Sequence, residues 1–250
     1  MEKRSKDELI LIALHLELPE LLRFCNTNKI INDKVCKNAD VWRRVVLRDF
    51  PGFKFESLDS ELKELFPKEI YTLLYTIRVW KLDIDVNQLY SEKNLKSDKK
   101  DITVIPENLH LPNLKTLMLR DNQIRTIPES LNLPNLRELY LSGNKITKIP
   151  ENLYLPKLHS LYLDNNQIRT IPQNLDNMPK LGYLFLSRNL IEEIPENLSL
   201  PKLKTLYIHT NKLKSIPEDL YLPKLKAIVL RDNKIKKIPK KFKKLIDPRL

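Results

Sequence analysis

The segment Pro-x-Leu-x-x-Leu-x-Leu-x-x-Asn occurs six times in tandem after residue 111, with Ile at two of the Leu positions. The period is 22 residues and lengthens once to 23, where Asp176-Asn177-Met178 contains one extra residue. The six segments begin at Pro112, Pro134, Pro156, Pro179, Pro201 and Pro223. A fixed period of this length predicts a solenoid, in which each repeat packs on its neighbours and the stack presents an extended surface suited to binding.

Each repeat is expected to contain one short strand and a polar residue that follows it. In the first repeat, Leu117 and Leu119 are two residues apart, so a strand turns both toward the core. Met118 then points to the opposite face. Asn122 follows where the chain turns, and its amide can bond the backbone groups that the turn leaves open. Pro128 excludes a helix in the returning stretch, which we expect to be extended or a single turn.

Between residues 101 and 245 this pattern resembles the leucine-rich repeat family. The resemblance covers six complete units and a leading partial unit at residues 102–109. It implies an α/β repeat solenoid that is right-handed and curved, with a parallel β-sheet on its concave face. Six strands at a spacing of about 4.8 Å would form a surface roughly 30 Å long.

Helical spacing of apolar residues predicts a small bundle before the repeats. We expect helices at residues 7–16, 18–25, 32–36 and 39–47, the last two preceded by Asn or Asp caps. A further helix at residues 67–82 would cap the solenoid or brace it, and an amphipathic segment around Phe242 would close the other end. The expected domain boundaries are 1–55 for the bundle, 56–90 for the linker and cap, and 91–250 for the repeats.

The stretch LELPELLRFCNTNKIINDKVC, followed by VWRRVV, resembles the F-box over roughly residues 6–48. An F-box-like module before leucine-rich repeats is the order found in substrate receptors of cullin–RING ubiquitin ligases. The terse repeats and the Asn-, Lys- and Ile-rich composition resemble F-box-like proteins of large cytoplasmic DNA viruses. The resemblance implies that the bundle docks a Skp-type adaptor while the concave face recruits a target protein. The adaptor contacts that it implies are Leu18, Pro19, Leu21, Leu22 and Trp42.

The outward strand positions are the candidate partner-binding residues. The central column is Met118, Tyr140, Tyr162, Phe185, Tyr207 and Val229. The flanking candidates are Arg120, Asp164, Arg188, His209 and Arg231. The aromatic side chains of the central column either stabilise the sheet as a cross-strand ladder or form the hot spot of a protein interface, and the two roles are compatible.

The net charge of +12 is unevenly distributed along the chain. Residues 1–90 contain 15 basic and 15 acidic side chains, whereas residues 212–250 contain 13 and 4. The outward columns of the strands carry both signs, so a nucleic acid is not the expected partner. We interpret the seven lysines between Lys234 and Lys244 as the solvated face of the closing segment. Binding of a nucleic acid or another anionic surface at this end is the alternative.

The two cysteines, Cys25 and Cys36, are expected to be buried in helices and reduced. The charged N-terminus does not predict a signal peptide, and no apolar run is long enough to span a membrane. These features predict an intracellular, cytoplasmic protein, in the host cytoplasm if the chain is viral. Since the sequence has no phosphate-binding glycine loop and no metal-ligand spacing, we expect no cofactor, no metal and no catalysis. We expect a monomer in isolation, and the alternative to a ligase receptor is a stand-alone interaction scaffold.

Overall fold

The structure is a computed structural model that describes residues 6–16, 20–21, 24–25, 31–173 and 175–246. The chain divides into two compact units, Met1–Tyr75 and Thr76–Leu250, and each is described by itself. Helix α6 (Pro67–Val79) begins in the first unit and ends in the second. The domain boundaries expected from the sequence stay predictions.

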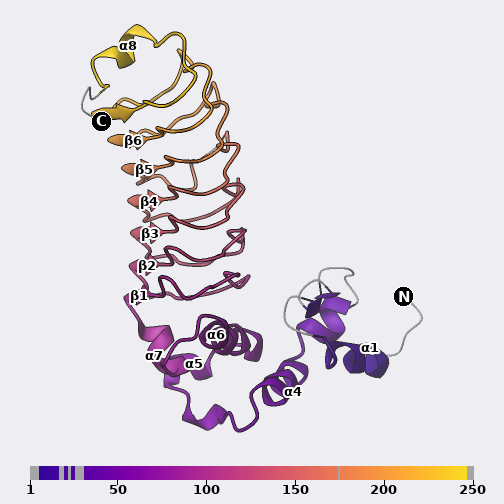
Figure 1. Ribbon diagram of the computed structural model, residues 1–250. Coiled ribbons are helices and arrows are strands. Elements are labelled where there is room, and N and C mark those ends of the chain that lie inside the picture. The colour runs from indigo at the N-terminus through magenta and orange to yellow at the C-terminus, as the bar shows by residue number, and fades with distance from the viewer. Residues whose placement is uncertain (1–5, 17–19, 22–23, 26–30, 174, 247–250) are drawn as a thin grey trace. The chain divides into compact units, whose positions relative to one another are not determined.

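Unit 1 is helical (Figure 1). Its main element is α4 (Ala39–Asp49), which begins where the Asn38 side chain accepts a hydrogen bond from the Asp40 backbone N–H at 3.0 Å. The other described elements before α6 are α1 (Lys6–Ala13), η1 (Asn32–Cys36), η2 (Phe55–Ser57) and α5 (Ser60–Lys63). The helix expected at 18–25 lies largely outside the described residues. The helices expected at 7–16, 32–36 and 39–47 are present, although no side chain caps η1.

The core of unit 1 contains the buried face of α4. The residues of α4 on this buried face are Val41, Trp42, Val45 and Val46. The indole Nε1 of Trp42 donates to the Cys36 carbonyl at 3.0 Å, and the Trp42 ring packs edge-on against Tyr71 at 5.9 Å between centroids. Because the only polar atom of this indole makes its hydrogen bond inside the core, Trp42 needs no hydrogen bond to water.

Cys25 and Cys36 are both buried, as expected, but they form a disulfide. The expectation of reduced cysteines is therefore wrong for this structure. The bond closes a chain segment of 11 residues between η1 and the preceding stretch. Disulfides are typical of oxidising compartments and rare in the cytosol, so this bond does not fit the predicted cytoplasmic location.

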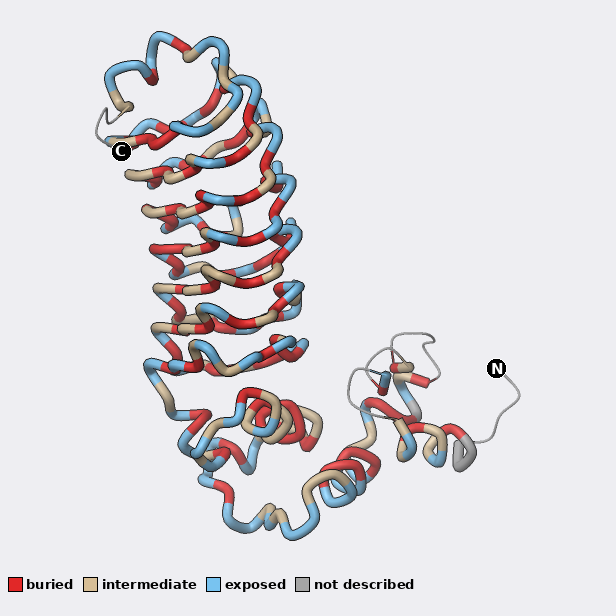
Figure 2. The backbone as a smooth tube through the Cα atoms, viewed as in Figure 1, coloured by how far each residue is buried: buried red, intermediate tan, exposed pale blue. Residues whose placement is uncertain are grey.

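Unit 2 is a solenoid built on one parallel sheet (Figure 1). After α7 (Val86–Ser91), seven strands follow in sequential order. They are β1 (Asn94–Lys96), β2 (Thr116–Met118), β3 (Glu138–Tyr140), β4 (Ser160–Tyr162), β5 (Tyr183–Phe185), β6 (Thr205–Tyr207) and β7 (Ala227–Val229). The middle residue of every strand is buried, while the outer strand residues are mostly half-buried, and buried and exposed positions alternate along the coils in Figure 2. The predicted fold class is confirmed.

The sheet begins one repeat earlier than the sequence pattern predicts. Leu95 pairs with Leu117 in register, so β1 is a seventh strand. The position that holds Leu119 in the next repeat is occupied here by Ser97, which is fully buried and whose Oγ has no hydrogen-bond partner among the described residues. Because a polar residue occupies this core position, the leucine pattern does not predict the strand.

The asparagines that follow the strands form the predicted ladder. Asn144 shows the arrangement: its Oδ1 accepts from the Ile124 N–H at 3.0 Å, and its Nδ2 donates to the carbonyls of Leu119 and Leu141 at 2.9 and 3.0 Å. Each amide thus joins its own repeat to the preceding one. The same bonds recur at Asn166, Asn189, Asn211 and Asn233.

The residue immediately before each of these asparagines is in the left-handed region. The positive φ angles are 54° at Asp121, 72° at Gly143, 54° at Asn165, 56° at Arg188, 55° at Thr210 and 55° at Asp232. This conformation turns the chain off the strand in every repeat. It is easy for glycine and asparagine and costly for a β-branched residue such as threonine.

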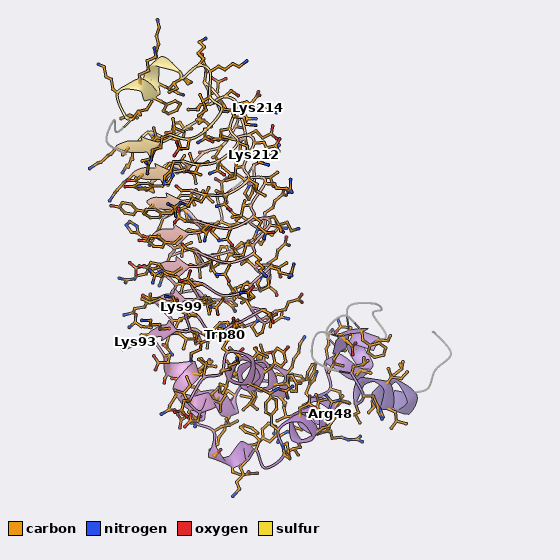
Figure 3. The ribbon with its side chains drawn as sticks, viewed as in Figure 1. Arg48, Trp80, Lys93, Lys99, Lys212 and Lys214 are labelled. Carbon is orange, nitrogen blue, oxygen red and sulfur yellow. A yellow bond between two sulfur atoms is a disulfide. The ribbon has the colours of Figure 1, made fainter. Side chains whose placement is uncertain are left out.

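Both ends of the solenoid are covered by chain from the same unit. At the first repeat, the indole of Trp80, which Figure 3 labels, donates to the Val104 carbonyl at 2.9 Å and is fully buried. At the last, α8 (Lys240–Lys243) buries Phe242, and the Ile228 N–H donates to the Leu245 carbonyl at 2.9 Å. The predicted closing segment is confirmed. Among the described residues, no helix is both long enough and apolar enough to cross a bilayer.

The 23-residue repeat does not disturb the strands. Leu161 pairs with Leu184 across it, in the register found elsewhere in the sheet. Leu175 and Met178 are both buried, so the extra residue is accommodated between them, on the return segment. The strand side of the unit is regular, and the variation in length is confined to the opposite side.

Candidate functional site: the concave sheet face

Four rings on consecutive strands form a continuous stack on the outward face of the sheet. These residues, which we call the aromatic row, are Tyr140, Tyr162, Phe185 and Tyr207. Successive ring centroids are 4.2, 4.4 and 4.9 Å apart, and adjacent planes differ by 10–12°. All four side chains are half-buried. The strand register places the rings one above another, because every outward position is opposite its equivalent in the next repeat.

Arg120 covers one end of the aromatic row. Its guanidinium carbon lies 3.9 Å from the centroid of the Tyr140 ring, a cation–π contact, and its backbone N–H donates to Asp98 Oδ1 at 2.7 Å. The Tyr140 hydroxyl donates to Glu138 Oε2 at 3.2 Å. Burial, with a smaller effect from the hydrogen bond to Tyr162, raises the pKa of Tyr140 to about 12, so its hydroxyl stays protonated at neutral pH.

The stacking determines which parts of the rings a ligand can meet. The face of each inner ring lies against the next ring, so the exposed parts are edges and hydroxyl groups. Such a surface offers apolar contact and hydrogen bonds together, at a small cost in side-chain entropy because the rings are already held.

The remaining members of the central column differ in accessibility. Met118 pairs with Tyr140 in register and is half-buried. Val229, opposite Tyr207, is only 1% exposed. The prediction that Val229 presents its side chain to a partner is wrong, because this short side chain lies below the surface at the closed end of the sheet.

The charged flanking residues form a mixed set. Arg188 and Arg231 are exposed, whereas Asp164 and His209 are half-buried. Asp164 Oδ1 accepts from the Ser187 N–H at 2.9 Å, and burial nevertheless raises the pKa of this carboxyl. Burial, and then the positive charge of Arg231, lower the pKa of His209. The structure therefore places both signs close to the aromatic row, and the role of each of these residues stays a prediction.

One aromatic contact was absent from the predicted site. Tyr183, the first residue of β5, lies edge-on to His159 at 5.2 Å between centroids, and Lys204 Nζ is 5.8 Å from the Tyr183 ring. Tyr183 is half-buried beside the aromatic row. Its position in the repeat is otherwise occupied by small or polar residues, so the periodic pattern gives little reason to single it out.

The predicted adaptor contacts in unit 1 are only partly described. Leu18, Pro19 and Leu22 lie outside the described residues, while Leu21 and Trp42 are each 1% exposed. Side chains this deeply buried serve the core and do not meet a partner in this conformation. Among the described residues of unit 1, the large apolar side chains that are exposed are Leu11 and Leu47, at 55% and 48%.

A second concavity lies on the return segments of unit 2. It has a volume of about 490 Å³, and the side chains around it include Glu129, Lys148, Glu151 and Glu193. Its described lining residues include no histidine, cysteine or serine. The lining belongs to the return segments and also includes Thr170, and we take the concave sheet face, with its ordered aromatic row, as the candidate functional site.

Comparisons with known proteins agree with this geometry. Family models described as "Leucine Rich repeats (2 copies)" match residues 112–155 and 134–177, and one described as "Leucine rich repeat" matches residues 156–213. Residues 112–213 are therefore similar to leucine-rich repeats. No curated protein matched the sequence.

Two solved structures are similar to this chain. The crystal structure of InlP from Listeria monocytogenes is 30% identical, with a TM-score of 0.52, over 63% of this chain and 43% of that one. The leucine-rich repeat domain of APL1B is 21% identical, with a TM-score of 0.52, over 70% of this chain and 51% of that one. The protein thus spans about half the length of these neighbours or less. These two similarities support the solenoid fold of unit 2.

Proposed function

We propose that the protein is an interaction module, and that the aromatic row on the concave face of unit 2 is the centre of the contact with a protein partner. The observation that carries this proposal is the continuous stack of four half-exposed rings on a rigid sheet. Tyrosine is enriched in interface hot spots, and pre-ordered side chains lower the entropic cost of binding.

The same stack argues against a nucleic-acid groove at this face. Single-stranded nucleic acids bind by stacking their bases on exposed aromatic faces. The inner faces of the aromatic row are occupied by one another, and Arg120 covers the outer face of Tyr140. The charged residues near the row carry both signs, so they do not form the positive track that phosphates need.

Affinity capture from cell lysate tests the proposal with a matched pair of variants. Tyr162→Ala and Phe185→Ala remove rings from the middle of the row, and we expect them to abolish capture of the proteins that the wild type retains. Tyr154→Ala is the control, because Tyr154 is 59% exposed but lies outside the strands, on a return segment. Capture that survives in the two row variants would overturn the proposal.

A more specific proposal is that unit 1 docks a Skp-type adaptor and makes the protein a substrate receptor of a cullin–RING ubiquitin ligase. It is supported by the F-box resemblance and by a helical unit placed before the repeats. Since Leu21 and Trp42 are buried, the exposed leucines of unit 1 are the better adaptor contacts. Co-precipitation with the adaptor should be lost in Leu11→Asp and Leu47→Asp but retained in Tyr162→Ala. If the wild-type protein does not co-precipitate the adaptor, this proposal is refuted.

The stand-alone scaffold is the second candidate, and the Cys25–Cys36 disulfide favours it. A ligase receptor works in a reducing compartment, where such a bond rarely persists. Mass spectrometry of the native protein after rapid thiol alkylation separates the two candidates. Alkylated cysteines support the cytoplasmic receptor, and an intact disulfide supports the scaffold.

A further inference from the structure

A column of basic side chains runs along the edge of the sheet where the strands begin. The residue immediately before each strand is exposed or half-buried and basic in six of seven repeats. These residues are Lys93, Lys115, Arg137, His159, Lys204 and Lys226. Gly182 occupies the seventh position. Figure 3 labels Lys93 beside β1, on the strand side of unit 2, and Lys212 and Lys214 on the opposite side.

Backbone hydrogen bonds hold this column in line. The N–H of each residue donates to the carbonyl of its equivalent in the preceding repeat. The bond from Lys115 to Lys93 is 2.7 Å, and the bond from Arg137 to Lys115 is also 2.7 Å. The series continues without interruption to Lys226, with distances of 2.7–2.9 Å. The side chains therefore follow each other at the strand spacing of about 4.8 Å.

A second basic column lies two residues earlier in the last four repeats. Its members are Lys157, Lys180, Lys202 and Lys224, all exposed. Together the two columns, which we call the basic rim, contain nine lysine and arginine residues and no acidic residue. Lys157 Nζ donates to Asn135 Oδ1 at 2.6 Å, and no ion pair to a rim residue occurs within the described parts of the chain.

The basic rim gives unit 2 an uncompensated positive edge. Six strand intervals at about 4.8 Å make it roughly 29 Å long. The acidic residues next to rim residues in the sequence are Glu92 and Glu138. The Glu138 carboxylate already accepts a hydrogen bond from the Tyr140 hydroxyl. A row of like charges on a rigid scaffold attracts an anion of matching length and speeds its association.

The chemistry of the rim and its surroundings favours a protein as that anion. Lysine pairs with carboxylate and with phosphate, so the adjoining surface decides between the two. The ring faces of the aromatic row stack on one another and leave only edges, so the bases of a single-stranded nucleic acid cannot stack there. The columns after the strands hold both signs and therefore give no second positive track for phosphates. A protein segment can instead alternate carboxylates with apolar side chains and so satisfy both surfaces.

We infer that the partner presents an acidic segment, whose carboxylates lie along the basic rim while its apolar side chains meet the edges of the aromatic row. This inference rests on the proposed function of the concave face and names the chemistry of the partner. The rim residues steer and orient the segment, and the aromatic row contributes the buried contact.

Fluorescence anisotropy with the full chain tests the inference. The probe is a labelled peptide in which Glu alternates with Leu and Tyr, compared with the same peptide carrying Lys for Glu and with a single-stranded RNA of equal charge. We expect the acidic peptide to bind most tightly, and its affinity to fall between about 50 and about 200 mM salt because the attraction is ionic. Tighter binding of the RNA, or no preference for the acidic peptide, would overturn the inference.

Two triple variants with the same change in net charge locate the contact. Lys115→Glu, Lys180→Glu and Lys202→Glu alter the rim, and Lys236→Glu, Lys240→Glu and Lys243→Glu alter the closing end. All six side chains are exposed, and circular dichroism should show both variants folded. We expect about a tenfold or greater loss of affinity in the rim variant and a much smaller change in the other. Equal losses would show a non-specific charge effect and refute the inference.

The captured proteins distinguish this inference from the proposed function. If Tyr162→Ala leaves capture unchanged while the rim triple variant abolishes it, the rim binds but the aromatic row is not the centre of the contact. If Tyr162→Ala abolishes capture and the rim variant does not, the concave face binds protein, and the inference that the partner presents an acidic segment is wrong.

Discussion

Replacing one buried ladder asparagine should destabilise the solenoid about twice as much as replacing its equivalent at the end. Asn166 is 8% exposed; its Oδ1 accepts from the Ile146 N–H at 2.9 Å, and its Nδ2 donates to the carbonyls of Leu141 and Leu163 at 2.9 and 3.1 Å. Asn166→Ala leaves the Ile146 N–H without its partner, whereas the carbonyls of Leu141 and Leu163 each lose one of two donors and keep the amides of Asn144 and Asn189. Asn233 makes the matching bonds to residues 213, 208 and 230 at 3.0 Å each, but it is half-buried.

The difference in solvent access sets the expected magnitude. A buried donor or acceptor left unpaired costs about 1–3 kcal/mol, so the single unpaired N–H and the two weakened carbonyls give a loss of about 2 kcal/mol for Asn166→Ala. At Asn233, water can reach the freed groups, and we expect a loss of about 1 kcal/mol.

Urea unfolding followed by far-ultraviolet circular dichroism measures these losses. With an m-value of about 3 kcal/mol/M, Asn166→Ala should lower the midpoint of the sheet transition by about 0.7 M. Asn233→Ala should lower it by about half of that amount. Equal shifts in the two variants, or a loss below about 1 kcal/mol for Asn166→Ala, would refute the view that the ladder acts by satisfying buried backbone groups.

Three further predictions concern the turns, the disulfide and the stacked tyrosine. Thr210→Gly should raise the free energy of unfolding by about 1 kcal/mol, because φ at Thr210 is 55°. Gly143→Ala, at φ 72°, should lower it by more than this amount, because the new Cβ would also lie 2.2 Å from Asp121 Oδ1; urea unfolding of the two variants should therefore give changes of opposite sign. Replacing Cys25 and Cys36 by Ala should destabilise unit 1 by about 3 kcal/mol and leave the unit 2 transition unmoved in calorimetry. Since the folded pKa of Tyr140 is raised to about 12, its stabilising effect is complete below the unfolded pKa of about 10 and is lost between these values. Tyr140→Phe should remove a step near pH 12 from an ultraviolet titration.

The repeats could be predicted from sequence because their determinants are local. Leu117 and Leu119 are two residues apart, Asn122 follows at a fixed distance, and the same spacing returns in every unit. A periodic pattern also determines register, because a slip of one residue would turn every leucine to the wrong face. The ladder and the inward leucines are therefore present as expected.

The features that the sequence did not predict depend on contacts between distant residues or on breaks in the pattern. Ser97 conceals β1, because it is polar where a leucine is expected. The pairing of Cys25 with Cys36 depends on how η1 approaches the preceding stretch, which spacing alone does not reveal. Val229 shares the outward position of the aromatic row, yet its burial is decided by the closed end of the sheet.

The basic rim was missed for a different reason. Its lysines are spread one or two to a repeat, so counting charge by segment assigns the excess to the region after residue 212. Only the register of the strands brings them into one line. The sequence contains the signal, but it becomes visible when equivalent positions are compared down the stack.

The extra residue between Leu175 and Met178 has a practical consequence for protein engineering. The strands on either side of it keep their register, so this part of the return segment already accommodates a longer loop without moving the sheet. A fluorophore-bearing cysteine or a short epitope inserted at Asp176–Asn177 would report on the solenoid from the side opposite the aromatic row. The molecule thus provides its own attachment point for measuring what binds to its other face.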